Sequence, residues 1–280
     1  MDNTINNDIL EPVNQKFIWL IGILLALLFF PTIIWLLDRW TMGVWQNGHS
    51  ILITAAVIYL IWKELKKIES FPISSSAWGF FLLVPALFLH MLDTGIHTQL
   101  LSAIAFFLSL PGLSFIFLGV KRTKVILFPL SMLIFTLPIP LTFTESLHLA
   151  LRHIATDSTG WLLNKAGIPS FTSGTLIEIP NGSLQVADAC SGFSTLYATV
   201  TIAILTAYLC PSILRRVIIL IIAIPLAIGV NVIRVFILTL LVHWFGLDVL
   251  ATSAHEISGL LTFMVALPLI FWLGQAPIKK

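Results

Sequence analysis

The sequence is poor in charge and in cysteine. Only 10% of its 280 residues are Asp, Glu, Lys or Arg, whereas soluble domains carry about 25%. So few charged residues make a water-soluble globule of this size untenable. A formal net charge of +2 also excludes the large basic surface that nucleic-acid binding needs. Two cysteines, Cys190 and Cys210, make neither a disulfide framework nor a four-ligand zinc site, and we expect no metal and no cofactor.

Hydrophobic residues make up 58% of the chain, with 20 Phe and 9 Trp. A helix needs about 20 consecutive apolar residues to cross a bilayer, and aromatic residues gather at its interfaces. The sequence therefore predicts an all-α polytopic membrane protein whose partner is the lipid bilayer. We expect eight membrane-spanning segments: Phe17–Leu37, His49–Trp62, Ala77–Leu92, Leu100–Val120, Val125–Phe143, Gly192–Leu209, Val217–Phe245 and Ile257–Gly274. The seventh is longer than a bilayer is thick, and we expect it to tilt, to project or to break near Pro225 and Gly229.

The basic residues predict an orientation. With a cytoplasmic N-terminus, eleven of the 15 Lys and Arg residues fall in cytoplasmic segments. Only Arg39, Arg152 and Lys165 fall outside, and Arg234 lies within a segment. This agrees with the positive-inside rule. We expect both termini to be cytoplasmic, in a multi-pass protein of the plasma (inner) membrane, and residues 144–190 to be extracytoplasmic.

The predicted extracytoplasmic segment has two parts. Glu145–Lys165 carries apolar residues near helical spacing, which predicts an amphipathic helix on the membrane surface. After Thr175 the apolar residues alternate on both sides of Asn181-Gly182, which is a strong signal for a β-hairpin. The hairpin leads directly into the sixth spanning helix.

Cys190 stands at the predicted N-terminal entrance of that helix. A helix N-terminus lowers the pKa of a thiol and favours the reactive thiolate, and Ser191-Gly192 permits a close approach of the backbone. The alternative is a buried, inert cysteine. Cys210, beside Pro211 at the other end of the helix, has no such setting and is predicted to be inert.

Arg234 follows Asn231 in Asn-Val-Ile-Arg, inside an otherwise apolar segment. A guanidinium at membrane depth costs several kcal/mol and usually faces a polar cavity. Arg234 lies 18 residues, or about 27 Å of helix, from Arg216, which puts it at the level of Cys190. The alternative is a structural charge partner or a side chain that reaches the interface.

His255 begins the last segment, in Ser253-Ala-His-Glu-Ile-Ser-Gly259. Position alone does not select it, because other histidines fall near the same predicted side: His49, His90, His97, His148 and His153.

Three blocks together carry a resemblance to a known family. Ala-Cys-Ser-Gly at 189–192, Asn-Val-Ile-Arg at 231–234 and His-Glu-Ile-Ser-Gly at 255–259 resemble, in order, the signature blocks of the exosortase/archaeosortase family. The resemblance covers about residues 120–275. Histidine in the third block is similar to the bacterial exosortase branch.

The resemblance implies a membrane-embedded cysteine protease or transpeptidase. Its partners would be exported, membrane-anchored proteins with a C-terminal sorting signal: a short motif such as Pro-Glu-Pro, a transmembrane helix and a basic tail. By this resemblance Cys190 is the nucleophile that forms a thioester, His255 the general acid/base, and Arg234 the group that stabilises substrate or oxyanion. Supporting residues would be Asn231, Ser191, Gly192, Glu256 and Asp188.

The same resemblance predicts a single integral-membrane domain over residues 1–280. Its first five helices would occupy 17–143, the extracytoplasmic helix and hairpin 144–190, and the catalytic helices 190–275, with the active site on the extracytoplasmic face.

One tension remains in this interpretation. A helix N-terminus disfavours a protonated imidazole, and His255 therefore needs an acidic neighbour. Glu256, Asp248 and Asp188 are all candidates. Asp188, two residues before the cysteine, would instead raise the pKa of the thiol if it faced inward.

Two other functions are alternatives to this one. A transporter or lipid-carrier-binding protein would use Arg234 to hold an anionic group, although the chain shows no repeated halves. An intramembrane serine protease would use Ser191 or Ser194, although Gly192-Phe-Ser194 lacks the second glycine of a nucleophile elbow. Inhibition of cleavage by thiol reagents separates the first function from both.

Overall fold

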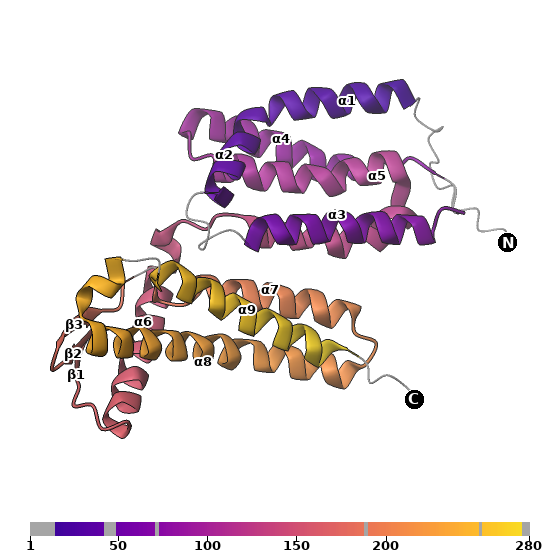
Figure 1. Ribbon diagram of the computed structural model, residues 1–280. Helices are drawn as coiled ribbons and strands as arrows, with labels where there is room; N and C mark the ends of the chain where they lie inside the picture. The colour runs from indigo at the N-terminus through magenta and orange to yellow at the C-terminus, as the bar shows by residue number, and fades with distance from the viewer. Residues whose placement is uncertain (1–14, 42–48, 71–72, 188–189, 252–253, 276–280) are drawn as a thin grey trace. The chain divides into compact units, whose positions relative to one another are not determined.

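A computed structural model describes residues 15–41, 49–70, 73–187, 190–251 and 254–275 (Figure 1). Helices dominate these residues, and the predicted all-α polytopic class is confirmed. The chain forms two compact units, Met1–Pro138 and Ile139–Lys280, and each is described by itself. The predicted single domain stays a prediction.

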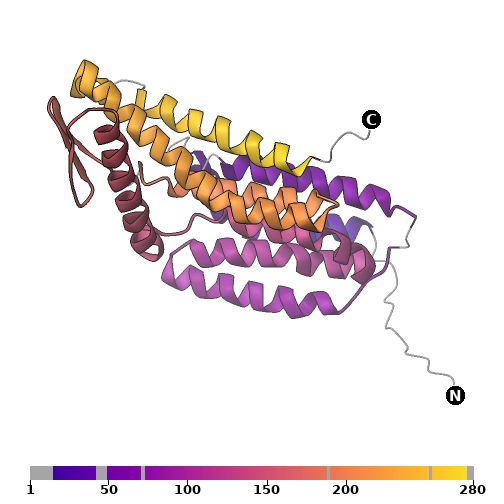
Figure 2. The same ribbon diagram turned by 90° about the horizontal axis from the view of Figure 1, so that it is seen from below.

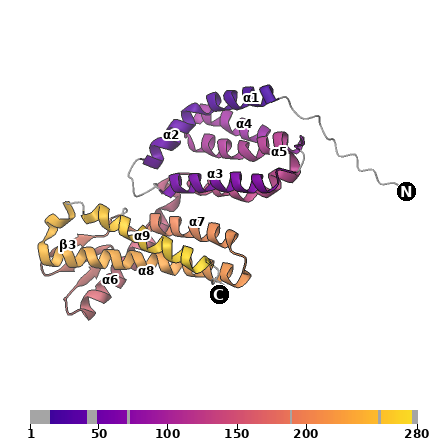
Figure 3. The same cartoon turned by 45° about the vertical axis from the view of Figure 1, so that its right-hand side comes forward.

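The first unit is built from helices, with α4 and α5 side by side (Figure 3). Its elements are α1 (Gln15–Leu28), α2 (Phe30–Thr41), α3 (His49–Lys67), α4 (Trp78–Ile96), α5 (Leu100–Ser131) and the 3₁₀ helix η1 (Met132–Thr136). The first predicted segment, 17–37, is not straight, because α1 and α2 meet at an angle of 63°. Pro31, in the first turn of α2, lacks the N–H that would continue the helical ladder.

The fourth and fifth predicted segments fall within α5, which is interrupted at Gly119. Gly119 has φ +77°, and a Cβ there would lie 2.9 Å from the carbonyl oxygen of Ser74, so both the conformation and the space require glycine. The fifth segment does not continue to Phe143 as predicted. The helical run ends at Thr136 before Pro138 and Pro140, and residues 141–143 begin the next helix.

Two basic clusters of the first unit lie at one end. Lys66 and Lys67 end α3, and Arg122 follows the interruption of α5. The Arg122 Nη2 atom donates a hydrogen bond to the carbonyl oxygen of Glu69, at 3.0 Å. This contact joins the region after α3 to the basic run after Gly119.

The second unit combines a bundle of three helices with a small sheet. Its elements are α6 (Leu141–Lys165), β1 (Phe171–Ser173), β2 (Leu176–Ile179), β3 (Gly182–Gln185), α7 (Phe193–Leu209), α8 (Ile213–Phe245), the 3₁₀ helix η3 (Leu247–Ala251) and α9 (Ala254–Gly274). Helices α7, α8 and α9 lie side by side (Figures 1 and 2). Ala203, Ile219, Ala223 and Ile270 form the core between them.

The predicted hairpin is present as β2 and β3, with its turn one residue earlier than expected. Ile179 pairs with Gly182, which makes Pro180 and Asn181 the turn residues instead of Asn181-Gly182. Proline favours the first position of such a turn because its φ is fixed. The Nδ2 atom of Asn181 donates to the carbonyl oxygen of His243, at 2.6 Å, and so attaches the turn to α8. Strand β1 was not predicted, and it is only three residues long.

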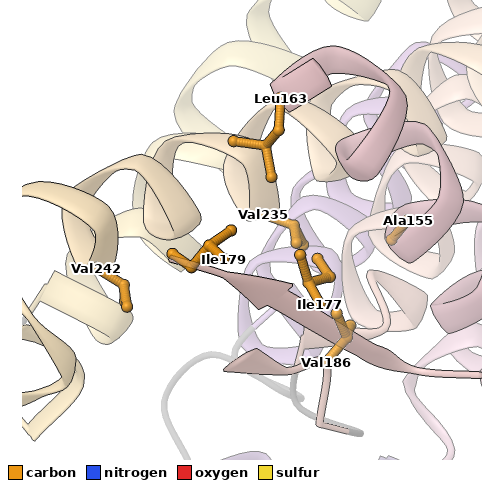
Figure 4. Close-up of a cluster of buried hydrophobic side chains, with 7 residues drawn as sticks. All are labelled: Ala155, Leu163, Ile177, Ile179, Val186, Val235 and Val242. Atoms are coloured by element: carbon orange, nitrogen blue, oxygen red, sulfur yellow. The ribbon is translucent and has the colours of Figure 1, made fainter. Parts of the chain in front are cut away.

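Helix α8 is continuous, and the predicted break near Pro225 or Gly229 is not found. Its 33 residues extend for about 50 Å. The N-terminal part packs in the three-helix core, whereas the C-terminal part packs against α6 and the sheet. Figure 4 shows this second core, in which Ile177 and Ile179 of β2 face Val235 of α8. One continuous helix therefore contributes to both cores.

Four helical stretches of the described chain are long and apolar enough to cross a membrane: α4, Leu100–Thr136, α8 and Ile257–Gly274. The bent pair α1–α2 adds a fifth if it forms one span, and α7 is apolar but shorter. The predicted number of eight spans stays a prediction. The amphipathic helix predicted over 145–165 is present as α6, and its position on the membrane surface also stays a prediction.

The predicted orientation is tested with single cysteines at positions 66 and 178 in a chain whose two native cysteines are replaced by alanine. Position 178 lies on an exposed site of β2 and is expected to react with a membrane-impermeant maleimide in intact cells. Position 66, at the end of α3, is expected to react only after the cells are permeabilised. The reverse pattern would contradict the orientation.

Candidate active site

Cys190 lies in the short turn that joins the sheet to α7. Its backbone N–H donates to the carbonyl oxygen of Ala187, at 2.9 Å, which closes the turn. The side chain is half-buried and packs against the core between the sheet and α8. Cys210 is buried at the opposite end of α7.

Asn231 of α8 fixes the turn that carries Cys190. Its side chain is buried, and its Nδ2 atom donates to the carbonyl oxygens of both Cys190 and Ser191, each at 3.2 Å. Gly192 makes this approach possible, because its φ is +80° and a Cβ there would lie 2.6 Å from Asn231 Nδ2. Any other residue at 192 would push the two elements apart.

Arg234 lies one helical turn beyond Asn231 and is only 8% exposed. Its Nε atom donates to the Ser258 hydroxyl in α9, at 3.1 Å. A Cβ at Gly259 would lie only 3.5 Å from Arg234 Nη2, so α9 approaches the guanidinium closely. Arg234 also interacts electrostatically with the Cys190 thiol. It thus connects the cysteine to the beginning of α9.

The environment of the thiol differs from the sequence prediction. Burial raises the pKa of the Cys190 thiol, and the positive charge of Arg234 opposes only part of that rise. A helix N-terminus was expected to lower this pKa, but burial removes solvation from the thiolate and has the larger effect. The thiol is therefore protonated at neutral pH, and a nucleophilic role requires a base.

Of the eight residues predicted for the site, the structure brings five together: Cys190, Ser191, Gly192, Asn231 and Arg234. His255 and Glu256 belong to the first turn of α9, and their side chains lie outside the description. Asp188 lies outside the described residues. Position 255 precedes Ser258 and Gly259 by three and four residues, a spacing that shares one side of a helix.

His148 is a further residue of the site, which the sequence did not single out. Its Nδ1 atom lies 3.0 Å from the Ser191 hydroxyl, and its ring stacks on Phe193 with centroids 4.4 Å apart. His148 differs from the other histidines because α6 packs beside the start of α7, and the sequence does not show this packing. Ser258, by contrast, already lies in the third sequence block and is one turn beyond His255.

Residues 40–272 match the family described as transmembrane exosortase. The chain belongs to this family. The match spans most of the chain and contains all three sequence blocks, and the predicted resemblance is confirmed. The chain matches no curated protein and no solved structure. The site thus belongs to a multi-pass membrane protein of the exosortase family.

Replacement of Gly192 by alanine tests the contact with Asn231. Gly167→Ala is a matched control, because Gly167 also has φ +80° but has no atom within 4 Å of an added Cβ. In both variants an alanine in the left-handed conformation destabilises the fold by roughly 1–2 kcal/mol. Only in Gly192→Ala does the added Cβ also clash with the Asn231 side chain. We expect a clearly lower thermal unfolding temperature for Gly192→Ala in detergent. Equal temperatures would contradict the close packing.

The pKa of Cys190 provides a second test. Arg234→Gln removes the charge that stabilises the thiolate, so the pKa should rise further and the pH profile of Cys190 alkylation should move to higher pH. Each unit of increase lowers the thiolate fraction at neutral pH about tenfold. Arg234→Lys keeps a charge and should shift the profile less. Iodoacetamide labelling, measured at Cys190 by mass spectrometry, gives the profile, and an unchanged profile in Arg234→Gln would refute the interaction.

Proposed function

We propose that the protein is a membrane-embedded cysteine peptidase or transpeptidase, which cleaves the C-terminal sorting signal of exported proteins. The observation that carries the proposal is the position of one buried cation. Arg234 interacts with the Cys190 thiol. Asn231, one turn earlier on the same helix, donates to the carbonyl oxygens of Cys190 and Ser191, in the turn before α7 that we call the cysteine turn. Membership of the exosortase family supports the same activity.

In the proposed reaction His255 takes the thiol proton and the Cys190 sulfur attacks the carbonyl carbon of the scissile peptide bond. Negative charge develops on the carbonyl oxygen, and the Arg234 guanidinium stabilises it. The C–N bond then breaks, and the imidazolium gives its proton to the departing amine. A thioester on Cys190 and a free C-terminal transmembrane helix result.

The thioester is resolved by a second nucleophile. Attack by water gives a free carboxyl terminus, and attack by an amine gives a new amide and therefore transpeptidation. In either case His255 accepts the proton of the incoming group, and the cysteine leaves as a thiolate beside Arg234. The pair of Cys190 and Arg234 thus acts in both halves of the reaction.

The continuous α8 supports an extracytoplasmic site. Arg216, near its N-terminus, donates to the carbonyl oxygen of Cys210 at 2.7 Å, and Arg215 bonds to the carbonyl oxygen of Gln275. This basic end of the unit is cytoplasmic by the positive-inside rule. Arg234 lies about 27 Å further along the helix, close to the thickness of the hydrocarbon core.

The pair of Ser191 and His148 raises a serine mechanism as a second candidate. Their side chains lie 3.0 Å apart, as a nucleophile and its base would. However, Ser191 is only 2% exposed, and its hydroxyl also accepts a hydrogen bond from the Phe193 N–H, at 3.3 Å. Both contacts suit a hydroxyl that fixes the beginning of α7, whereas Cys190 is half-exposed and next to a cation.

Alanine variants separate the two mechanisms. Cys190→Ala should abolish cleavage of a co-expressed reporter that carries a Pro-Glu-Pro sorting signal, because no thioester can form. Ser191→Ala should retain measurable cleavage at matched expression. Mass spectrometry of the wild type should detect the thioester on Cys190. Cleavage by Cys190→Ala together with its loss in Ser191→Ala would reverse the assignment.

The two histidines provide a further test. His255→Ala should slow formation of the acyl-enzyme by orders of magnitude, whereas His148→Ala, which disturbs only the start of α7, should have a smaller effect. Residues that act in one step show non-additive losses. The double variant Arg234→Lys/His255→Ala should therefore be scarcely slower than the worse single variant. Additive losses would show that the two residues act independently.

A further inference from the structure

An apolar cavity opens beside the proposed nucleophile. Its volume is about 180 Å³, and its walls are Leu184, Gln185, Val186, Ala187, Cys190, Val235 and Leu238. The sheet and the cysteine turn supply one side, and α8 supplies the other. Among these lining residues the Cys190 thiol is the reactive group, and most of the other side chains are aliphatic. We call this space the Cys190 cavity.

We propose that the Cys190 cavity binds an apolar side chain of the substrate, next to the scissile bond, while the substrate backbone lies extended along β3. The proposal rests on the proposed function and names the substrate feature that the same site selects. A side chain seated here lies in contact with the nucleophile, because Cys190 is part of the wall.

The size and chemistry of the cavity limit its occupant. A dry apolar cavity of about 150 Å³ is known to hold benzene, so a cavity of 180 Å³ accommodates a branched aliphatic or ring-shaped side chain. A charged side chain would lose its hydration against Val235 and Leu238, which are both buried, and the described lining residues carry no charged side chain to compensate it. The cavity therefore favours apolar residues of medium size.

The position of β3 in the sheet favours an extended substrate. The strand order is β1-β2-β3, so one edge of β3 has no strand beside it in the described part of the chain. The Val186 N–H donates to the Thr175 carbonyl, at 2.8 Å, and in an antiparallel pair alternate residues face the partner. Ser183 and Gln185 therefore direct their backbone groups away from β2. A peptide that pairs with this edge follows the chain toward Cys190 and gains main-chain hydrogen bonds.

Ala187 is the residue best suited to a test. It lines the cavity but is exposed, so that Ala187→Leu fills space without disturbing a buried core. Its backbone carbonyl, which accepts the hydrogen bond from Cys190, is unchanged. Ala166→Leu is the matched control, because Ala166 is exposed at the end of α6 and does not line the cavity.

The first experiment uses small thiol probes on the full-length protein. Alkylation of Cys190 by N-cyclohexylmaleimide and by N-(2-hydroxyethyl)maleimide is followed by mass spectrometry, which separates it from Cys210. Burial of apolar surface should favour the cyclohexyl reagent by about fourfold per methylene group that enters the cavity. We expect this preference in the wild type and in Ala166→Leu, and a substantially smaller preference in Ala187→Leu. An equal preference in all three proteins would overturn the proposal.

The second experiment uses the reporter substrate with Gly, Ala, Val, Leu or Phe at each position that flanks the cleaved bond. Wild type should cleave best with a medium-sized apolar residue at one of these positions, and Ala187→Leu should shift that preference toward Gly or Ala. An identical profile in both proteins would overturn the assignment of the cavity. Cleavage that persists in Cys190→Ala would instead overturn the proposed function, while the maleimide preference would still report on the cavity.

Discussion

The arrangement of the site depends on the contact between Asn231 and the backbone of the cysteine turn. One amide nitrogen holds two successive carbonyl groups, and a glycine with positive φ makes room for it. This contact adds directional hydrogen bonds to the apolar packing of Cys190 against the core beside α8. The cysteine turn is thereby held beside Asn231, one turn before Arg234 on α8, and Arg234 in turn bonds to Ser258 of α9.

Burial of the Arg234 guanidinium and the Cys190 thiol costs solvation free energy. The Arg234 guanidinium is only 8% exposed, and its hydrogen bond to the Ser258 hydroxyl offsets part of the solvation that it loses. Burial nevertheless has the larger effect on the cysteine, whose pKa is raised. The resting site therefore keeps a neutral thiol next to a cation. That state avoids a permanent thiolate and forms an attractive ion pair when a base removes the proton.

Several features of this fold were readable from local sequence because their causes are local. Apolar length predicted the helices, and alternation predicted the hairpin. The sequence predicted a break after Val120, close to the interruption of α5, but not the reason for glycine at 119. An added Cβ there would lie 2.9 Å from the carbonyl oxygen of Ser74, which is 45 residues away in sequence. His148 was missed because its partner Ser191 comes from another element. A break near Pro225 was one of three alternatives expected for this long segment, and α8 is continuous instead.

Helix α8 carries both Arg234 and one wall of the Cys190 cavity, and it therefore fixes their relative positions. Asn231 and Arg234 lie at the point where this helix leaves the core shared with α7 and α9, and Val235 and Leu238 begin the wall of the Cys190 cavity. A break at this level would let the sheet and the cysteine turn move against Arg234. An unbroken helix instead transmits the packing of Val242 against the sheet directly to the arginine. In the proposed reaction, the continuity of α8 supplies the preorganisation that electrostatic stabilisation of an oxyanion requires.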